Sequence, residues 1–288
     1  MSISIKNLNY VYSPESPFEK QALHNISLEI SDGEFVGIIG HTGSGKSTLI
    51  QHINGLIKPA SGEIEVNGIS AASKGARLRQ LRFEVGLVFQ YPEYQLFDET
   101  VFADIAFGPK NMGLSEAEIR ERVTEAAESV GIPAELLDKS PFDLSGGQKR
   151  RVAIAGVLAM RPSVLILDEP AAGLDPAGRK EILAEIYRIY RERSMTVIMV
   201  SHSMEEIAKI AGRIIVMSDG EIKMDGTPEE IFSHPELLKS MSLDVPQVST
   251  LISELKRRGA PLEGNIFTVE AAKAAILKLL GKAGGANA

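Results

Sequence analysis

A glycine-rich segment near the N-terminus constrains the fold of this chain more than any other stretch of its sequence. The segment fits the pattern G-x-x-x-x-G-K-[ST] at every fixed position, and its members are Gly40, His41, Thr42, Gly43, Ser44, Gly45, Lys46 and Ser47. Glycines allow the backbone to wrap closely around phosphates, so that several N–H groups point inward. Lys46 can then reach the β- and γ-phosphates, and the Ser47 hydroxyl can bind Mg²⁺. The segment therefore predicts a site for a nucleoside triphosphate.

The residues on either side supply the structural context that such a loop needs. Residues 34–39 contain a short apolar run that predicts a buried strand. Residues 47–53, which include Thr48, predict the start of a helix, whose N-terminus would direct the positive end of its dipole at the phosphates. A strand, a glycine loop and a helix in this order favour a triphosphate site over a glycine turn with an incidental lysine.

The composition bounds the class of protein. A chain of 288 residues with 44% hydrophobic content indicates one large domain, or one core with an appendage. The net charge of −7 argues against non-specific nucleic-acid binding, so no nucleic-acid partner is expected. The chain has no cysteine, which excludes disulfides and thiolate metal sites. No apolar run approaches the roughly 18 residues that a spanning helix needs, and the N-terminus lacks the apolar core of a signal peptide. We expect a soluble, cytoplasmic protein that meets a membrane only through a partner.

The pattern of elements changes along the chain. In residues 1–70, the alternation at residues 25–30 and 63–66 predicts an antiparallel sheet beside a parallel core. Residues 91–160 are expected to be a mainly helical insertion, in which Ser115 and Glu118 form a capping box.

Residues 163–218 are again expected to alternate between strands and helices. The apolar runs at 164–167 and 196–200 flank a helix at 179–191, which predicts a parallel sheet covered on both faces. From about residue 240 the chain is expected to form an appendage, with helices at 248–258 and 269–280, the second capped by Thr268.

Two carboxylates, Asp168 and Glu169, follow the apolar run at 164–167. Side chains alternate along a strand, so adjacent carboxylates at its end point in different directions. One can bind Mg²⁺ while the other faces the site of water attack. We assign Asp168 to the Mg²⁺ shell and Glu169 to polarising the water. For the pair taken alone, a solvent-exposed strand end remains the alternative.

A second anion-binding helix end is predicted near the middle of the chain. Leu144 precedes a serine and two glycines at the start of a predicted helix over residues 149–160, in the order Ser145, Gly146, Gly147 and Gln148. No lysine stands at the loop position, so the segment complements the first site. An ordinary capped helix start is the alternative.

Three further polar or aromatic residues are candidates for the site. Gln90 and His202 each follow a strand-like run, and a polar residue at the exit of a core strand can reach a site at the sheet edge. Tyr12 precedes the glycine loop and can stack on a base. Taken singly, residues of these types are more often ordinary surface or core residues.

Together and in this order, these pieces resemble the ATP-binding cassette (ABC) ATPases over about residues 1–235. Residues 144–148 resemble a motif that is nearly specific to that family, and the segment at 172–175 follows in the order usual for the family. The resemblance implies an α/β P-loop NTPase core with an antiparallel β subdomain, a helical subdomain at about 91–160 and a small helical appendage at 240–288. It also implies a head-to-tail dimer that holds two ATP molecules at its interface.

The resemblance also implies a role for each residue that binds the nucleotide. Tyr12 would stack on adenine, and Lys46 with the loop amides would hold the phosphates. Ser47, Gln90 and Asp168 would serve Mg²⁺.

Catalytic roles follow from the same resemblance. Glu169 would act as the catalytic base, and His202 would contact the γ-phosphate. Residues 145–147 of the other subunit would complete the site, and Asp175 would lie at the dimer interface.

A narrower resemblance concerns the segments at 88–101 and 105–109, which look like those of energy-coupling factor (ECF) ATPases that drive uptake of vitamins or of nickel and cobalt ions. It implies a second ATPase subunit, identical or related, an integral membrane coupling subunit and a separate membrane substrate-binding subunit. The chain would then lie peripherally on the cytoplasmic face of the cell membrane, with the appendage aiding ATPase pairing. Glu93, Asp98 and Glu99 could receive arginines of the coupling subunit, or could form a solvated acidic loop.

Three other functions remain as alternatives. The first is the ATPase of another ABC importer, such as one with a periplasmic binding protein. The second is a soluble ABC protein acting on nucleic acid or ribosomes, but only 53 residues, 91–143, separate Gln90 from Leu144 and show no sustained heptads. The third is a small-molecule kinase, which would leave residues 145–148 and His202 without a role.

Overall fold

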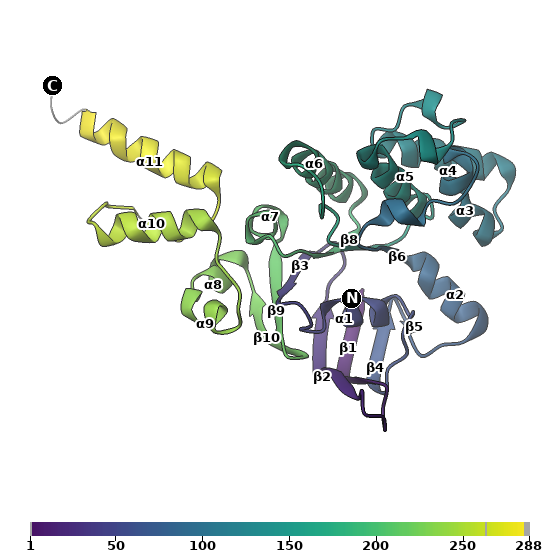
Figure 1. Cartoon of the computed structure of the whole chain (residues 1–288), viewed down its shortest axis with the longest axis horizontal. Helices are drawn as coiled ribbons and strands as arrows, with labels where there is room; N and C mark the ends of the chain where they lie inside the picture. The colour runs from purple at the N-terminus through teal and green to yellow at the C-terminus, as the bar shows by residue number, and fades with distance from the viewer. Residues whose placement is uncertain (1, 263, 285–288) are drawn as a thin grey trace.

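The computed structural model describes residues 2–262 and 264–284 and contains two β-sheets with helices around them (Figure 1). The first sheet is antiparallel and consists of β1 (Ile3–Tyr12), β2 (Lys20–Ile30), β4 (Ser61–Val66) and β5 (Ile69–Ser70), in the order β2-β1-β4-β5. The second consists of β3 (Phe35–Gly40), β6 (Val85–Val88), β7 (Val164–Asp168), β8 (Thr196–Val200), β9 (Arg213–Ser218) and β10 (Glu221–Gly226). Its order is β10-β9-β3-β8-β7-β6, and only β10 runs antiparallel to its neighbour. The predicted antiparallel sheet beside a parallel core is confirmed.

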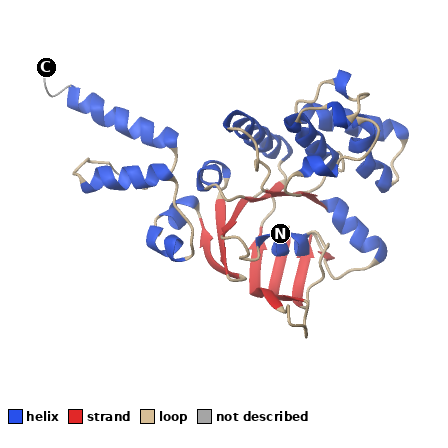
Figure 2. Cartoon of the chain, viewed as in Figure 1, coloured by secondary structure: helices blue, strands red, loops and turns tan. Residues whose placement is uncertain are grey.

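Most helices lie on the outer faces of the two sheets, whereas the helix at Lys46–Ile53 packs between the sheets (Figure 2). In chain order, the first α-helices are α1 (Lys46–Ile53), α2 (Gly75–Glu84), α3 (Val101–Met112), α4 (Glu116–Ser129), α5 (Gly146–Leu158) and α6 (Pro176–Arg193). The remaining α-helices are α7 (Met204–Ile210), α8 (Pro228–Phe232), α9 (Pro235–Ser240), α10 (Gln247–Arg257) and α11 (Val269–Gly284). Short 3₁₀ turns are η1 (Pro92–Gln95), η2 (Ala134–Leu136) and η3 (Pro141–Asp143). No helix in the described ranges is long and apolar enough to cross a membrane.

The parallel sheet separates two hydrophobic cores, because successive side chains of each strand point to opposite faces. On β7, Leu165 and Leu167 join the core that contains residues of α3 to α7. Val164 and Ile166 join the other core, with α1 and the antiparallel sheet. Figure 1 shows the antiparallel sheet on one side of the parallel sheet and α5 and α6 on the other. The apolar strands are therefore buried on both faces, as their sequence predicted.

Within residues 91–160, α3, α4 and α5 pack against one another. The predicted capping box begins α4: the Ser115 hydroxyl accepts from the Glu118 N–H at 3.4 Å, and the Glu118 carboxylate accepts from the Ser115 N–H at 3.0 Å. This box satisfies N–H groups that have no partner inside the helix.

The two last helices, α10 and α11, contact each other and extend away from the sheets (Figure 1). Both lie within a few residues of their predicted positions, and Thr268 caps α11 by accepting from the Ala271 N–H at 3.3 Å. Ile252 of α10 and Ala272 of α11 are buried. The ring centroid of Phe267 lies 6.0 Å from that of Phe232 on α8.

Candidate functional site

The glycine loop connects the end of β3 with the start of α1, as its sequence predicted. Gly43 and Gly45 have φ of 84° and 103°, a left-handed conformation that favours glycine. A Cβ on Gly45 would lie 2.6 Å from the carbonyl oxygen of Ala22 on β2. The loop therefore needs glycine here both for its backbone conformation and for its close approach to β2.

The side chain of Lys46 folds back across the loop. Its Nζ donates to the carbonyl oxygens of Gly40 at 2.7 Å and His41 at 3.0 Å. Burial lowers the pKa of Lys46, and the carboxylates of Glu169 and Asp168 oppose that effect. The loop thus carries a cation among buried polar groups, where it can meet a phosphate.

Another observation at the loop fits an anionic ligand. The buried hydroxyl of Ser44 has no hydrogen-bond partner among the described residues. Buried polar atoms in native proteins are normally paired, so a phosphate held by the loop would satisfy a group that the protein leaves open. The loop residues therefore fit the triphosphate that the motif predicts.

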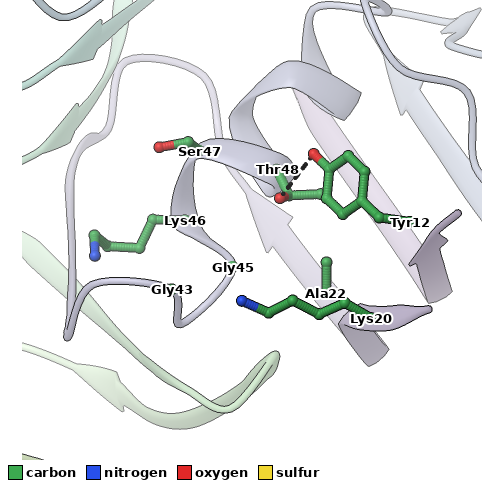
Figure 3. A pocket seen from close by; sticks show the side chains of 8 residues that line it. All are labelled: Tyr12, Lys20, Ala22, Gly43, Gly45, Lys46, Ser47 and Thr48. Atoms are coloured by element: carbon green, nitrogen blue, oxygen red, sulfur yellow. Dashed lines mark hydrogen bonds between the residues drawn. The ribbon is translucent and has the colours of Figure 1, made fainter. Parts of the chain in front are cut away.

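A hollow of about 170 Å³ lies beside the loop (Figure 3). Its lining residues are Tyr12, Lys20, Ala22, Gly43, Gly45, Lys46, Ser47 and Thr48. The Tyr12 hydroxyl lies 3.3 Å from the Thr48 hydroxyl, and the Tyr12 side chain is 38% exposed. The ring is therefore fixed at one end and open to a stacking partner.

Two lining residues, Lys20 and Ala22, were not found from the sequence. Both belong to β2, which lies beside the loop, and Figure 3 shows the Lys20 side chain extending toward it. The Lys20 Nζ would lie 3.8 Å from a Cβ on Gly43. A lysine within an alternating strand carries no local signal of such a role.

The structure brings together Gln90, Glu169 and His202. The Glu169 Oε1 lies 2.7 Å from Nε2 of His202, and Oε2 accepts from Nε2 of Gln90 at 3.2 Å. Glu169 has a φ of 50°, and its N–H donates to the carbonyl oxygen of Val200 at 2.9 Å. A non-glycine residue in this conformation is strained, and such strain is concentrated at functional sites. The turn directs the carboxylate across the ends of β6, β7 and β8.

Asp168, one residue earlier, has different neighbours. Burial raises the pKa of Asp168, and a hydrogen bond from Ser47 and the charge of Lys46 oppose that rise. The two carboxylates therefore face different groups, as the alternation of side chains predicted.

The three predicted Mg²⁺ ligands are of the types that this ion prefers. Ser47, Asp168 and Gln90 offer hydroxyl, carboxylate and amide oxygens. Among the residues that the structure describes, no group of three or more histidine or acidic side chains is arranged to hold an ion. This donor set suits an ion that is bound mainly by substrate phosphates and water.

Residues 145–148 lie at the N-terminus of α5. The Ser145 hydroxyl accepts from the Gln148 N–H at 3.3 Å, and the Gln148 Oε1 accepts from the Ser145 N–H at 3.0 Å. A Cβ on Gly146 or Gly147 would meet nothing within 4 Å, so this helix end is open. Ser145, Gly147 and Gln148 line a separate hollow of about 230 Å³, and none of them lines the hollow beside the glycine loop.

The acidic segment after Gln90 differs in part from its prediction. Glu93 forms a two-pronged ion pair with Arg150 of the same chain, with distances of 2.8 and 3.0 Å. It is therefore not free to receive an arginine from another subunit, and this part of the prediction is wrong. The Asp98 side chain accepts from the Glu99 N–H at 3.0 Å, and Glu99 is exposed.

Comparison with known proteins agrees with this site. The family model described as ABC transporter matches residues 23–172. The energy-coupling factor transporter ATP-binding protein EcfA2 of Clostridium perfringens (strain 13 / Type A) is 59% identical over 281 residues, which cover 97% of this chain and 99% of the relative. The EcfA2 protein of Symbiobacterium thermophilum is 50% identical over an alignment that covers 100% of this chain and 99% of the relative.

Solved structures show the same fold. The cbiO1 protein of Clostridium perfringens, described as part of the ABC transporter complex cbiONQ, superimposes with a TM-score of 0.73 at 41% identity, covering 87% of this chain and 98% of its own. A dimeric ATP-binding cassette bound to ADP and phosphate superimposes with a TM-score of 0.70 at 30% sequence identity. The match covers 78% of this chain and 98% of the cassette.

The fold and the site thus define an ATPase of the ABC transporter class. The chain belongs to the ABC transporter family and, within it, to the energy-coupling factor transporter ATP-binding proteins. It binds and hydrolyses ATP as the energy-coupling subunit of an importer of this type. The predicted family, fold class and enzymatic activity are confirmed.

Proposed function

We propose that Glu169 is the general base of ATP hydrolysis and that Gln90 and His202 hold its carboxylate beside the γ-phosphate. The observation that carries the proposal is the meeting of these three side chains at the ends of neighbouring parallel strands. A carboxylate whose two oxygens are fixed by neighbouring side chains can orient a water molecule and accept its proton. Phosphoryl transfer needs mainly such positioning together with stabilisation of charge.

The other site residues hold the nucleotide. The loop amides and Lys46 bind the β- and γ-phosphates, while Tyr12 stacks on the base and His202 also contacts the γ-phosphate. Ser47, Gln90 and Asp168 would hold Mg²⁺, which when bound neutralises charge on the phosphate oxygens.

We further propose that two ATPase subunits pair head to tail, so that residues 145–147 of one subunit close the phosphate site of the other. Two separate hollows on one chain, one at the glycine loop and one at residues 145–148, support this arrangement. The open helix end at Gly146 and Gly147 gives N–H groups that can meet a phosphate. Gln148 would support this end through its bond to Ser145.

The partner proteins follow from the same proposal. Residues 1–235 form the ATPase domain, and residues 240–288 form an appendage that aids pairing with an identical or related ATPase. The pair acts at the cytoplasmic face of the membrane under an integral coupling subunit, which contacts a membrane substrate-binding subunit. Because that last subunit selects the substrate, a vitamin or a transition-metal ion, selectivity lies outside this chain. No nucleic-acid partner is proposed.

Isolation of the intact complex tests these partners. The complex is purified from membranes through an affinity tag on this chain, and its subunits are identified by mass spectrometry. We expect integral membrane proteins together with either a second ATPase or two copies of this chain. Recovery of this chain without any membrane protein would contradict the proposal.

Pairing is tested separately with the Glu169→Gln chain, which is expected to bind ATP but barely hydrolyse it. Light scattering with ATP and Mg²⁺ should show a pair of ATPase subunits, and ADP serves as the matched control. If ATP never increases the fraction of paired subunits over ADP, the head-to-tail arrangement is wrong.

A further inference from the structure

Arg150 on α5 is a charged side chain in the interior of the protein. It is only 1% exposed and ranks among the largest fully buried side chains of the described residues. Removing a guanidinium from water is expensive unless its N–H groups are all well paired. Its contacts therefore indicate what the charge does there.

The Arg150 guanidinium makes four hydrogen bonds to two separate segments. Nε and Nη2 donate to the two carboxylate oxygens of Glu93 at 3.0 and 2.8 Å. Nη1 donates to the carbonyl oxygens of Pro170 at 3.2 Å and Ala172 at 2.7 Å. The planar fork of arginine is suited to this arrangement, whereas the ammonium of lysine lacks the matching geometry.

Both segments adjoin residues of the proposed catalytic group. Pro170 directly follows Glu169, and the Ala172 N–H donates back to the Glu169 carbonyl oxygen at 3.1 Å. Glu93 stands three residues after Gln90, whose amide donates to the Glu169 carboxylate. Arg150 thus holds the turn that carries Glu169 and the turn that carries one of its hydrogen-bond partners.

A second contact joins the same two turns. Tyr91 has a φ of 55°, and a Cβ on Gly173 would lie 3.2 Å from its Cε1 atom. The aromatic ring therefore packs closely on the glycine backbone. This contact links the same two turns at a second point, beside Gln90 and Ala172.

We propose that Arg150 is a positioning residue for ATP hydrolysis, which clamps the turn at residues 90–93 to the turn at residues 169–172 and so sets the separation of Gln90 from Glu169. The inference rests on the proposed role of Glu169. Because Arg150 lies on α5, a displacement of this helix relative to the parallel sheet changes the geometry around the catalytic carboxylate. The charge thereby links the helical part of the chain to the rate of hydrolysis.

The test separates positioning from folding. Arg150→Met leaves the partly buried Glu93 carboxylate without its partner, and this single variant can fail to fold. The double variant Arg150→Met/Glu93→Gln removes both charges and is measured in the intact complex for unfolding midpoint, ATP affinity, KM and kcat. We expect ATP affinity and KM within about twofold of the parent and kcat lower by about tenfold to a hundredfold, as small displacements of reacting groups produce.

Arg150→Lys tests the contacts to the two carbonyl oxygens. Lysine preserves the charge opposite Glu93 but not the four-bond fork, so kcat should recover only in part. Arg161→Met is the matched control, since Arg161 also pairs with two carboxylates, Glu121 and Glu125, but at the surface. Its kcat should stay within about twofold of the parent, because surface pairs contribute little.

A folded double variant with unchanged kcat, or full activity of Arg150→Lys, would overturn the inference. A fall in ATP affinity as large as the fall in kcat would also overturn it, because the clamp acts on hydrolysis and not on binding. Failure of the proposed function is a different result, in which Glu169→Gln hydrolyses ATP normally.

Discussion

Glu169 and His202 lie 2.7 Å apart, Oε1 to Nε2, although 32 residues separate them along the chain. The parallel sheet causes this contact. Glu169 follows β7 directly and His202 follows β8 by two residues, and Asp168 pairs with Val200 across these neighbouring strands. The carboxyl ends of parallel strands meet at one edge, where ligands of open α/β sheets bind.

Replacing Glu169 by glutamine should stop hydrolysis without preventing ATP binding. Glutamine keeps the size and a hydrogen-bonding oxygen but does not accept a proton, so kcat should fall by about a hundredfold or more. ATP affinity is measured with a fluorescent analogue and turnover by phosphate release. Glu192→Gln, on the exposed end of α6, is the matched control and should leave both unchanged. Near-normal turnover in Glu169→Gln would contradict the role of this carboxylate.

Replacing Tyr12 distinguishes base stacking from support of the loop. Tyr12→Ala removes the ring, and ATP affinity should fall by about tenfold to a hundredfold, the range for loss of one stacked base. Tyr12→Phe keeps the ring and removes only the contact to Thr48 at 3.3 Å, so affinity should change much less. Equilibrium binding of ATP to both variants makes the comparison. Equal affinities of the two variants would show that the ring does not stack.

Replacing Gly45 by alanine should damage the phosphate loop. The left-handed backbone and the approach of 2.6 Å to the Ala22 carbonyl oxygen leave no room for a Cβ, and backbone strain alone costs about 1–3 kcal/mol. ATP binding should be lost or greatly weakened, which calorimetry measures. In Gly212→Ala, the control, the added Cβ would be 3.9 Å from its nearest neighbour. Normal ATP binding by Gly45→Ala would refute the steric argument.

Local patterns predicted the parts of the site and of the fold that each lie within one short segment. The glycine loop, the paired acids after β7 and the capping box at Ser115 depend on neighbours a few residues away. The contact between Glu169 and His202 was not predicted, because it depends on β7 and β8 being neighbours in the parallel sheet.

The sequence did not predict contacts that tertiary packing alone creates. Lys20 reaches the glycine loop from another sheet, and Glu93 meets Arg150 across 57 residues of chain. The helix α2 was also missed, because Leu81 is its one buried residue and leaves no apolar periodicity. An exposed charge and a buried charge look alike in a sequence when the partner is distant.

The buried carboxyl of Glu206 should make stability depend on pH. Burial raises the pKa of Glu206, while a hydrogen bond from Ser201 at 3.0 Å and the charge of Arg179 oppose the rise. The folded state therefore holds the proton more tightly than the unfolded chain, whose carboxyl keeps its ordinary pKa of 4.5. This contribution to stability is complete below that value and is lost as the pH rises through the raised pKa.

Comparison with Glu206→Gln isolates this contribution, because glutamine does not titrate and can still accept from Ser201. The unfolding midpoint of the variant relative to the parent, measured by urea denaturation, should rise as the pH increases above the ordinary carboxyl pKa of 4.5. Glu34→Gln is a control of opposite sign: burial would raise the pKa of Glu34, but hydrogen bonds from Ser31 and Arg213 lower it overall. Glu34 therefore stabilises the parent above the ordinary pKa, and Glu34→Gln should lose stability relative to the parent as the pH rises from the acid range. A pH-independent difference between Glu206→Gln and the parent would show that the buried carboxyl keeps the same pKa in the folded and unfolded states.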